Sequence, residues 1–335
     1  LLNIKTLPSE MNSFSERIFN INSEKDFNKL CMNLFDFQME NNPIYSAYAK
    51  IILKGKNPNN INEIPFLPIE FFKTDQIICT GGEIEEIFLS SGTTGNQSKH
   101  LITNLEIYKK SFRKSFDQFY GNISEYCILS LLPNYREREG SSLIYMVDDF
   151  IKNSQHPKSG FYLNNYKGLS STLEELEKKG QKTILIGVSY ALLDLSDQFP
   201  QRLEHTIIME TGGTKGERKE LIKEELHKIL KNAFSLNKIH SEYGMTELLS
   251  QSYSKGDNIF KSPTWKKILI RDVNDPLTII GNDKTGGINI IDLANIYSCP
   301  FIATQDLGKT FDDGSFSVLG RFDNSDVRGC NLLIQ

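Results

Sequence analysis

The chain has 335 residues, of which 39% are hydrophobic and 24% are charged, the composition of a folded protein with a large core. Its net charge of −4 argues against a nucleic-acid-binding protein, because contact with a phosphate backbone needs an excess of basic side chains. No apolar run approaches the roughly 18 residues of a membrane-spanning helix, and residues 1–10 lack the residue order of a secretory signal. We therefore expect neither nucleic acid as a partner nor a membrane span.

The cysteines are odd in number and widely spaced, and none forms a Cys-x-x-Cys pair. This pattern argues against both a zinc site and a disulfide framework. It is typical of a protein of the reducing cytoplasm, which is the expected location. The five cysteines are Cys31, Cys79, Cys127, Cys299 and Cys330.

The apolar residues from Phe27 to Leu34 keep helical spacing and predict a helix over 22–38. From residue 84 onward the patterns of strands and helices alternate, which predicts an α/β fold with largely parallel strands. Glycine-rich loops that follow such strands are expected where ligands bind. The predicted elements are a strand at 87–89, a helix from a Thr103–Glu106 capping box to 121, a strand at 126–132, a helix at 173–179, strands at 183–188 and 205–209, and a helix at 217–234.

After Trp265 the pattern changes to short β segments separated by glycine turns. We therefore expect two parts: an α/β core with an N-terminal helical segment over 1–254, and a β-rich subdomain over 255–335. The β segments of the second part are predicted at 277–280, 288–292 and 315–319.

The strongest chemical signal is the segment from Ser90 to Lys99, which reads SSGTTGNQSK. Its glycines allow a tight turn in which consecutive backbone amides surround an anion, while the hydroxyls and Lys99 add donors and a positive charge. This chemistry suits a polyphosphate, although the segment is not a Walker loop. A polar surface loop between a strand and a helix is equally compatible with the composition. His100, the next residue, is either close to a bound phosphate or, as we expect, solvated at the helix entry.

Three further segments carry side chains suited to a nucleotide. Residues 242–247 read EYGMTE and offer an aromatic face for a base and a carboxylate for magnesium. Residues 304–308 supply Asp306, which can accept hydrogen bonds from ribose hydroxyls, and residues 320–323 supply Arg321 for a phosphate or ribose contact. Each segment alone is also compatible with an ordinary turn.

In this order, the four segments resemble the motifs of the adenylate-forming superfamily of acyl-CoA synthetases and peptide-synthetase adenylation domains. The resemblance covers about residues 87–330 and implies use of ATP and Mg²⁺. It implies a phosphate loop at Ser91, Gly92, Thr93, Thr94, Gly95 and Lys99, an adenine site at residues 210–213 (including Gly212 and Gly213), Tyr243 and Gly244, a phosphate contact at Thr246, a magnesium ligand at Glu247, and nucleotide contacts at Asp306 and Arg321.

Finer features resemble the LuxE family, the acyl-protein synthetases of bacterial fatty-acid reductase systems. They are PFLPIEFFK at 65–73, REREGSSL at 136–143 and VRGC at 327–330. The resemblance implies that a fatty acid and ATP give an acyl-adenylate, and that the acyl group moves to Cys330 and on to a reductase or carrier protein. Considered alone, Cys330 is also compatible with a small buried side chain.

The chain ends shortly after Asp323, which resembles the hinge of the superfamily. We therefore expect the small mobile C-terminal domain to be absent, together with the lysine that assists adenylation in acyl-CoA ligases. The expected fold is an α/β adenylate-forming large domain with a β-rich C-terminal subdomain. Two other functions stay open: an acyl-CoA ligase resembling phenylacetate-CoA ligase, and a non-catalytic nucleotide-binding scaffold.

Overall fold

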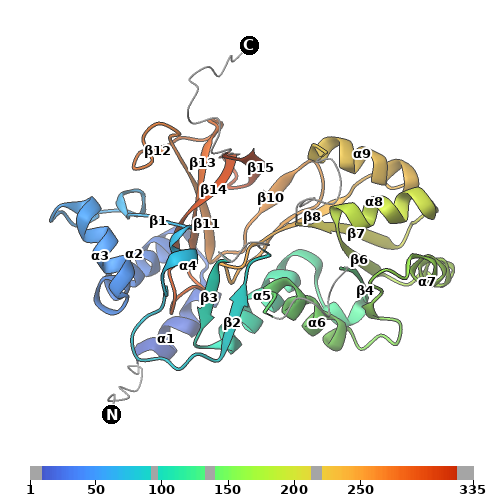
Figure 1. Ribbon diagram of the computed structural model, residues 1–335, viewed down its shortest axis with the longest axis horizontal. Coiled ribbons are helices and arrows are strands. Elements are labelled where there is room, and N and C mark those ends of the chain that lie inside the picture. The colour runs from blue at the N-terminus through green and yellow to red at the C-terminus, as the bar shows by residue number, and fades with distance from the viewer. Residues whose placement is uncertain (1–9, 92–96, 133–139, 213–220, 323–335) are drawn as a thin grey trace.

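The computed structural model of the protein describes residues 10–91, 97–132, 140–212 and 221–322 (Figure 1). The helices are α1 (Glu10–Arg17), α2 (Glu24–Asn41), α3 (Pro43–Leu53), α4 (Phe71–Thr74), α5 (Leu105–Tyr120), α6 (Ser142–Ser154), α7 (Tyr166–Lys178), α8 (Ser189–Gln198) and α9 (Lys223–Phe234), with 3-10 turns at Ile18–Asn20, Ile61–Glu63 and Ile123–Glu125. The strands are β1 (Leu67–Pro68), β2 (Glu86–Leu89), β3 (Lys99–Ile102), β4 (Cys127–Leu131), β5 (Gly160–Phe161), β6 (Thr183–Val188), β7 (Thr206–Thr211), β8 (His240–Tyr243), β9 (Ser252–Ser254), β10 (Ile259–Lys261), β11 (Lys266–Arg271), β12 (Ile279–Ile280), β13 (Gly286–Asp292), β14 (Phe301–Thr310) and β15 (Phe316–Arg321).

One sheet runs through the described part of the chain in the order β12-β11-β13-β14-β15-β10-β9-β8-β7-β6-β4-β5, with β1 added beside β14. The strands from β8 to β5 pair in parallel, as the alternating pattern predicts. From β8 to β12 every pairing along this path is antiparallel. The sheet therefore changes from parallel to antiparallel pairing at β8, and the motif 242–247 begins on that strand.

Helices cover both faces of the parallel half, and β4 shows why. Its residues Cys127, Leu129 and Leu131 join a buried cluster with α7, α8 and α9. Ile128 of the same strand, and Leu132 directly after it, join the cluster that contains α5 and α6. Because successive side chains of a strand point to opposite faces, a strand with apolar residues on both faces needs a helix layer on each side. Figure 1 shows α8 and α9 on one side of these strands and α5 and α6 on the other.

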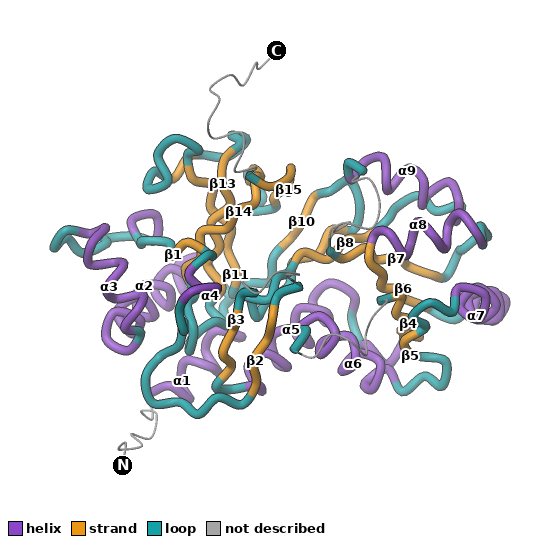
Figure 2. The backbone as a smooth tube through the Cα atoms, viewed as in Figure 1, coloured by secondary structure: helices purple, strands orange, loops and turns teal. Residues whose placement is uncertain are grey.

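The β-rich half packs against the N-terminal helices, as Figure 2 shows for α2 and α3 beside β1 and β14. Phe301 at the start of β14 lies in this core. Two buried polar side chains also bind the turn between β13 and β14. Gln38 of α2 donates to Ile296 O at 2.6 Å, and Asn42, directly after the helix, donates to Ser298 O at 2.7 Å. These bonds hold a turn that borders the candidate site.

Most predicted elements are present. The predicted helix 22–38 is α2, and the predicted strands at 126–132, 183–188 and 205–209 are β4, β6 and β7. The boundary proposed between residues 254 and 255 stays a prediction; the sheet continues through β9 and β10 on either side of it. In the part of the chain that the structure describes, no helix is both long and apolar enough to cross a membrane.

Three local predictions are wrong. The cap of α5 is Asn104, whose side chain accepts from the Ile107 amide, whereas the buried Thr103 hydroxyl has no partner among the described residues. The predicted strand 87–89 lies in β2, which among the described residues pairs with β3 in a separate antiparallel sheet, so the loop after it joins two strands rather than a strand and a helix. The helix predicted over 217–234 begins later, because α9 starts at Lys223. Residues 217–220 of the predicted helix lie outside the described residues.

Candidate active site

Three of the predicted residues meet at the carboxyl end of β8. The Tyr243 hydroxyl donates to Oδ2 of Asp306 at 2.7 Å, and Nε of Arg321 donates to Oδ1 of the same carboxylate at 3.2 Å. Asp306 and Arg321 are opposite each other on β14 and β15, so the strand register fixes this pair. The Arg321 side chain is 64% exposed while that of Asp306 is 11% exposed. The carboxylate is therefore buried except on the side covered by a solvated arginine.

Tyr243 is held from several sides. The rings of Phe260 and Phe316 lie 5.8 and 5.6 Å from its ring centroid, and the Lys266 ammonium lies over the ring at 5.4 Å. Burial, followed by the charge of Asp306, raises the pKa of Tyr243 well above its ordinary value. The phenol therefore stays protonated at neutral pH and keeps donating to Asp306.

The predicted adenine segment lies beside this group, at the end of β7. The Thr211 hydroxyl donates to the buried carboxylate of Glu242 on β8, and Gly212 has a φ of +71°, where glycine is favoured. Glu242 also explains the glycine at position 244, because a Cβ there would lie 2.4 Å from Oε1 of Glu242. Gly213 lies outside the described residues.

Glu247, the predicted magnesium ligand, is a buried carboxylate with 6% of its surface exposed. Burial raises its pKa, while a hydrogen bond from Ser98 and the charges of Arg321 and Lys73 act in the opposite direction. A carboxylate whose charged form is poorly solvated gains from a nearby cation. Among the described residues, no group of three or more His, Cys, Asp or Glu side chains gathers as a metal cluster. Glu247 therefore suits Mg²⁺, which proteins commonly hold through one or two carboxylates and the phosphates of a substrate.

Thr246 is joined to the β2–β3 hairpin by His100. Nδ1 of His100 lies 2.9 Å from the Thr246 carbonyl and Nε2 lies 2.7 Å from Oγ of Ser298. The expectation that His100 is solvated at a helix entry is wrong, because it is fully buried on strand β3. Burial lowers the pKa of His100 to about 4, so the ring is neutral near pH 7.

The base of the hairpin that carries the predicted phosphate loop is well connected. Ser90 N donates to Ser98 O at 3.0 Å, and Ser98 N donates to Oγ of Ser90 at 2.9 Å. The side-chain amide of Gln97 donates to Ser90 O at 2.8 Å. Ser91 and Lys99 are exposed on either side of the loop. Gly92, Thr93, Thr94 and Gly95 lie outside the described residues, as do Asp323 and Cys330.

The buried histidine gives a pH prediction. Between pH 6.5 and 4 the unfolded chain binds a proton at His100 while the folded chain does not, so stability that is present above pH 6.5 is lost as the pH falls towards 4. His100→Asn cannot titrate. We therefore expect the difference in the free energy of unfolding between wild type and this variant to fall by about 2–4 kcal/mol between pH 7 and 4.

Urea unfolding of both proteins at several pH values measures this difference. His240, whose pKa burial also lowers to about 4, is present in both proteins and its effect cancels. A difference that does not change with pH would show that folding leaves the pKa of His100 at its ordinary value.

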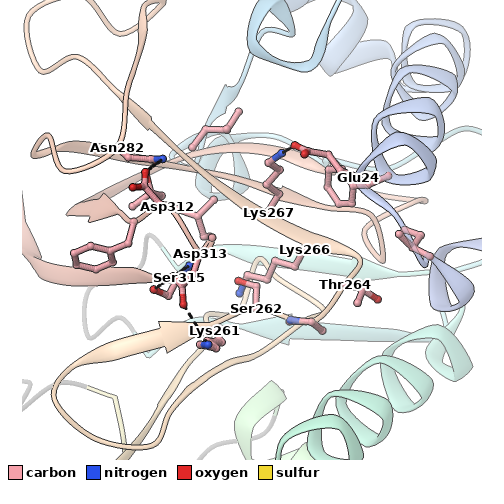
Figure 3. A pocket seen from close by; sticks show the side chains of 18 of the residues that line it. Glu24, Lys261, Ser262, Thr264, Lys266, Lys267, Asn282, Asp312, Asp313 and Ser315 are labelled. Atoms are coloured by element: carbon pink, nitrogen blue, oxygen red, sulfur yellow. Dashed lines mark hydrogen bonds and ion pairs between the residues drawn. The ribbon is translucent and has the colours of Figure 1, made fainter.

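A separate open cleft of about 690 Å³ lies on the β-rich half, between the start of α2 and the strands β10, β11 and β14 (Figure 3). Its charged groups largely neutralise one another: Lys267 pairs with Glu24 at 2.6 Å and Lys261 with Asp313 at 3.2 Å. The predicted site residues do not line it. The cleft adjoins the group around Tyr243 at Lys266, which lines the cleft and whose ammonium lies over the tyrosine ring.

No family model matches the sequence, and no characterised protein matches it in sequence. Several solved structures match the fold. 2-Hydroxyisobutyryl-CoA ligase (HCL) in complex with 2-HIB-AMP and CoA aligns with a TM-score of 0.65 at 12% identity, over 97% of this chain and 74% of that chain. HCL in the postadenylation state with R3-HIB-AMP gives 0.64 at 9% identity, over the same 97% and 74%. ATP-bound MatB from Rhodopseudomonas palustris gives 0.55 at 14% identity, over 72% of this chain and 48% of that chain.

The chain has the α/β fold of the adenylate-forming large domain. This confirms the fold class predicted from the sequence. The aligned part spans about half the length of MatB. At such low identity the likeness establishes the fold, and the activity has to be derived from the side chains of the site.

Sequence patterns missed several residues that shape the site. His100, Lys266, Asp292 and Asn295 contact the segment 246–250 from three strands and from the turn after β13. None of them lies in one of the four motifs, and no local spacing distinguishes them from ordinary polar residues. The only available signal was the position of His100, one residue after the phosphate-loop motif.

Proposed function

We propose that this protein activates a carboxylic acid with ATP, forming an acyl-adenylate and pyrophosphate. The observation that carries the proposal is the convergence of Tyr243, Asp306 and Arg321 at the end of β8, with Glu247 close enough for the charge of Arg321 to lower its pKa. An aromatic ring, a ribose-type acceptor, a cation and a magnesium-type carboxylate are the groups that a bound ATP requires.

In this proposal Asp306 accepts hydrogen bonds from the ribose, and Tyr243 with residues 210–213 and Gly244 lines the adenine. Ser91, the loop 92–95, Lys99 and Thr246 contact the phosphates. Glu247 holds Mg²⁺, which, when bound, neutralises phosphate charge. The carboxylate oxygen of the substrate forms a bond to the α-phosphorus, and the bond from that phosphorus to the pyrophosphate oxygen breaks. Fixed donors around the phosphates stabilise the charge that develops.

We further propose a fatty acid as the substrate and Cys330 as the acyl acceptor, as in the LuxE family. The Cys330 thiolate forms a bond to the acyl carbon and AMP leaves, after which a reductase or carrier protein accepts the acyl group. The chemistry of the other thiols supports this choice. Cys31, Cys79, Cys127 and Cys299 are buried, and burial raises the pKa of each thiol, so that little nucleophilic thiolate exists near neutral pH.

A second candidate is an acyl-CoA ligase, because the fold matches HCL in complex with CoA. The two candidates differ in the acyl acceptor. Product that depends on coenzyme A in a saturable way would favour the ligase, whereas acyl-protein formed without coenzyme A favours the acyl-protein synthetase. A non-catalytic scaffold would bind the nucleotide yet give no exchange with any acid.

The ribose contact can be tested by Asp306→Ala. Loss of an acceptor of charge-assisted hydrogen bonds is expected to weaken ATP binding about 10- to 100-fold, measured by isothermal titration calorimetry with Mg²⁺. Asp312→Ala is a matched control, because Asp312 is an exposed carboxylate in the turn after β14 whose hydrogen bond comes from Asn282. Equal ATP affinity in wild type and Asp306→Ala would remove Asp306 from the nucleotide site.

A further inference from the structure

The segment 246–250, which carries Thr246 and Glu247, is held by buried side chains. The Asn295 amide donates to Glu247 O at 2.8 Å, and its Oδ1 accepts from Leu249 N at 3.0 Å. Oδ2 of Asp292 accepts from Leu249 N at 3.1 Å and from Ser250 N at 2.9 Å. Buried backbone groups need such partners, and these four bonds fix the side of the segment that faces the turn between β13 and β14.

His100 holds the start of the same segment, at Thr246. The Thr246 carbonyl can only accept, so the proton lies on Nδ1 of His100, and Nε2 accepts from the Ser298 hydroxyl. Ser298 belongs to the turn that also carries Asn295. One neutral imidazole therefore joins the hairpin, the segment 246–250 and the turn 292–299, with both ring nitrogens in use.

The alternation of side chains along residues 98–100 places the His100 contact next to a contact with Glu247, the candidate metal ligand. Ser98 and His100 are both buried while Lys99 between them is exposed, as expected for successive residues of an extended chain. Ser98 donates to the Glu247 carboxylate and His100 to the carbonyl of the preceding residue, Thr246. Two neighbouring contacts therefore set the register between the base of the predicted phosphate loop and Glu247.

We propose that His100 is a positioning residue that fixes the Thr246–Glu247 segment against the base of the 90–98 loop, and so sets where Glu247 meets the phosphates and their Mg²⁺. The proposal rests on the proposed function. His100 is fully buried, and in this proposal it acts through its bond to the Thr246 carbonyl rather than by touching substrate or metal. Misplacement of a reacting group by about 1 Å can lower a rate by about 100-fold.

Two variants separate the hydrogen bond from packing. His100→Asn places an amide nitrogen close to where Nδ1 lies and keeps the bond to Thr246 but loses volume. His100→Phe keeps a ring, which already packs edge-on against Phe72 at 5.6 Å, but loses both hydrogen bonds. Ser298→Ala removes only the partner of Nε2 and is expected to fall between the two. If His100 only fills space, the phenylalanine variant resembles wild type and the asparagine variant is the more damaged.

Pyrophosphate exchange and hydrogen–deuterium exchange together test the proposal. We expect His100→Phe to lower kcat about 10- to 100-fold with a smaller change in KM for ATP, and His100→Asn to stay within a few-fold of wild type. Amide exchange of residues 246–250 should rise in His100→Phe and not in His100→Asn. Unchanged protection in His100→Phe, or an equal loss of kcat in both variants, would overturn the proposal. A wild type without pyrophosphate exchange would instead overturn the proposed function, and amide exchange would still decide whether His100 holds the segment.

Discussion

Replacing Glu247 with Gln is expected to lower ATP–pyrophosphate exchange by about 100-fold or more while leaving the fold at least as stable as wild type. Gln keeps the shape and the hydrogen-bonding capacity towards Ser98 but cannot supply a negative charge to Mg²⁺. Burial raises the pKa of Glu247, which means that the fold disfavours the charge it carries. Removing that charge should therefore cost activity and not stability.

Exchange rates at increasing Mg²⁺, together with thermal unfolding, measure both halves of this expectation. Glu106→Gln is a matched control, because Glu106 is exposed in the first turn of α5 and pairs only with Lys109 among the described residues. Exchange at the wild-type rate in Glu247→Gln, at the same Mg²⁺ concentration, would show that another group holds the metal.

Cys330→Ser is expected to abolish hydroxylamine-sensitive acyl labelling of the protein while ATP–pyrophosphate exchange continues at the wild-type rate. Adenylate formation involves no thiol, whereas the second step needs a thiolate, which is a far better nucleophile than a hydroxyl near neutral pH. The protein is incubated with radiolabelled fatty acid and ATP and then resolved under denaturing conditions.

Cys127→Ser provides the comparison for this experiment. Burial raises the pKa of Cys127 to about 11, and the neighbouring Ser159 hydroxyl can bond to a serine there. Its labelling should equal that of wild type. Equal thioester labelling of Cys330→Ser would place the acyl group on another thiol or on coenzyme A, and would leave the acyl-CoA ligase as the better description.

The fold and the site differ in how far the sequence could predict them. A run of mostly apolar residues such as β6 indicates from its own sequence a strand buried on both faces. Residues 183–188 were therefore predicted with the bounds that the structure gives. The pairing of β2 was not predictable in this way, because a four-residue strand reads alike in a parallel sheet and in a hairpin. The cap of α5 shifted by one residue because Thr103 and Asn104 are both good caps, and tertiary packing buried Thr103.

Within the site, the motif residues Tyr243, Asp306 and Arg321 were predicted because each belongs to a short segment that can be identified from the sequence alone. In the structure Tyr243 and Arg321 both bond to the Asp306 carboxylate. His100 and Asn295 were not, because their importance comes from contacts 146 and 48 residues away along the chain. Positions that support a site from outside its motifs have no local pattern, so only the folded arrangement identifies them.

The most direct test of the central claim is ATP–pyrophosphate exchange by the full chain across a panel of carboxylic acids that runs from short to long fatty acids, with Glu247→Gln assayed beside it. We predict label transfer from pyrophosphate into ATP that depends on one class of acid and on Mg²⁺, highest for fatty acids, and lost in the variant. Absence of exchange with every acid, from a folded protein that binds ATP, would contradict the proposal that this chain forms acyl-adenylates.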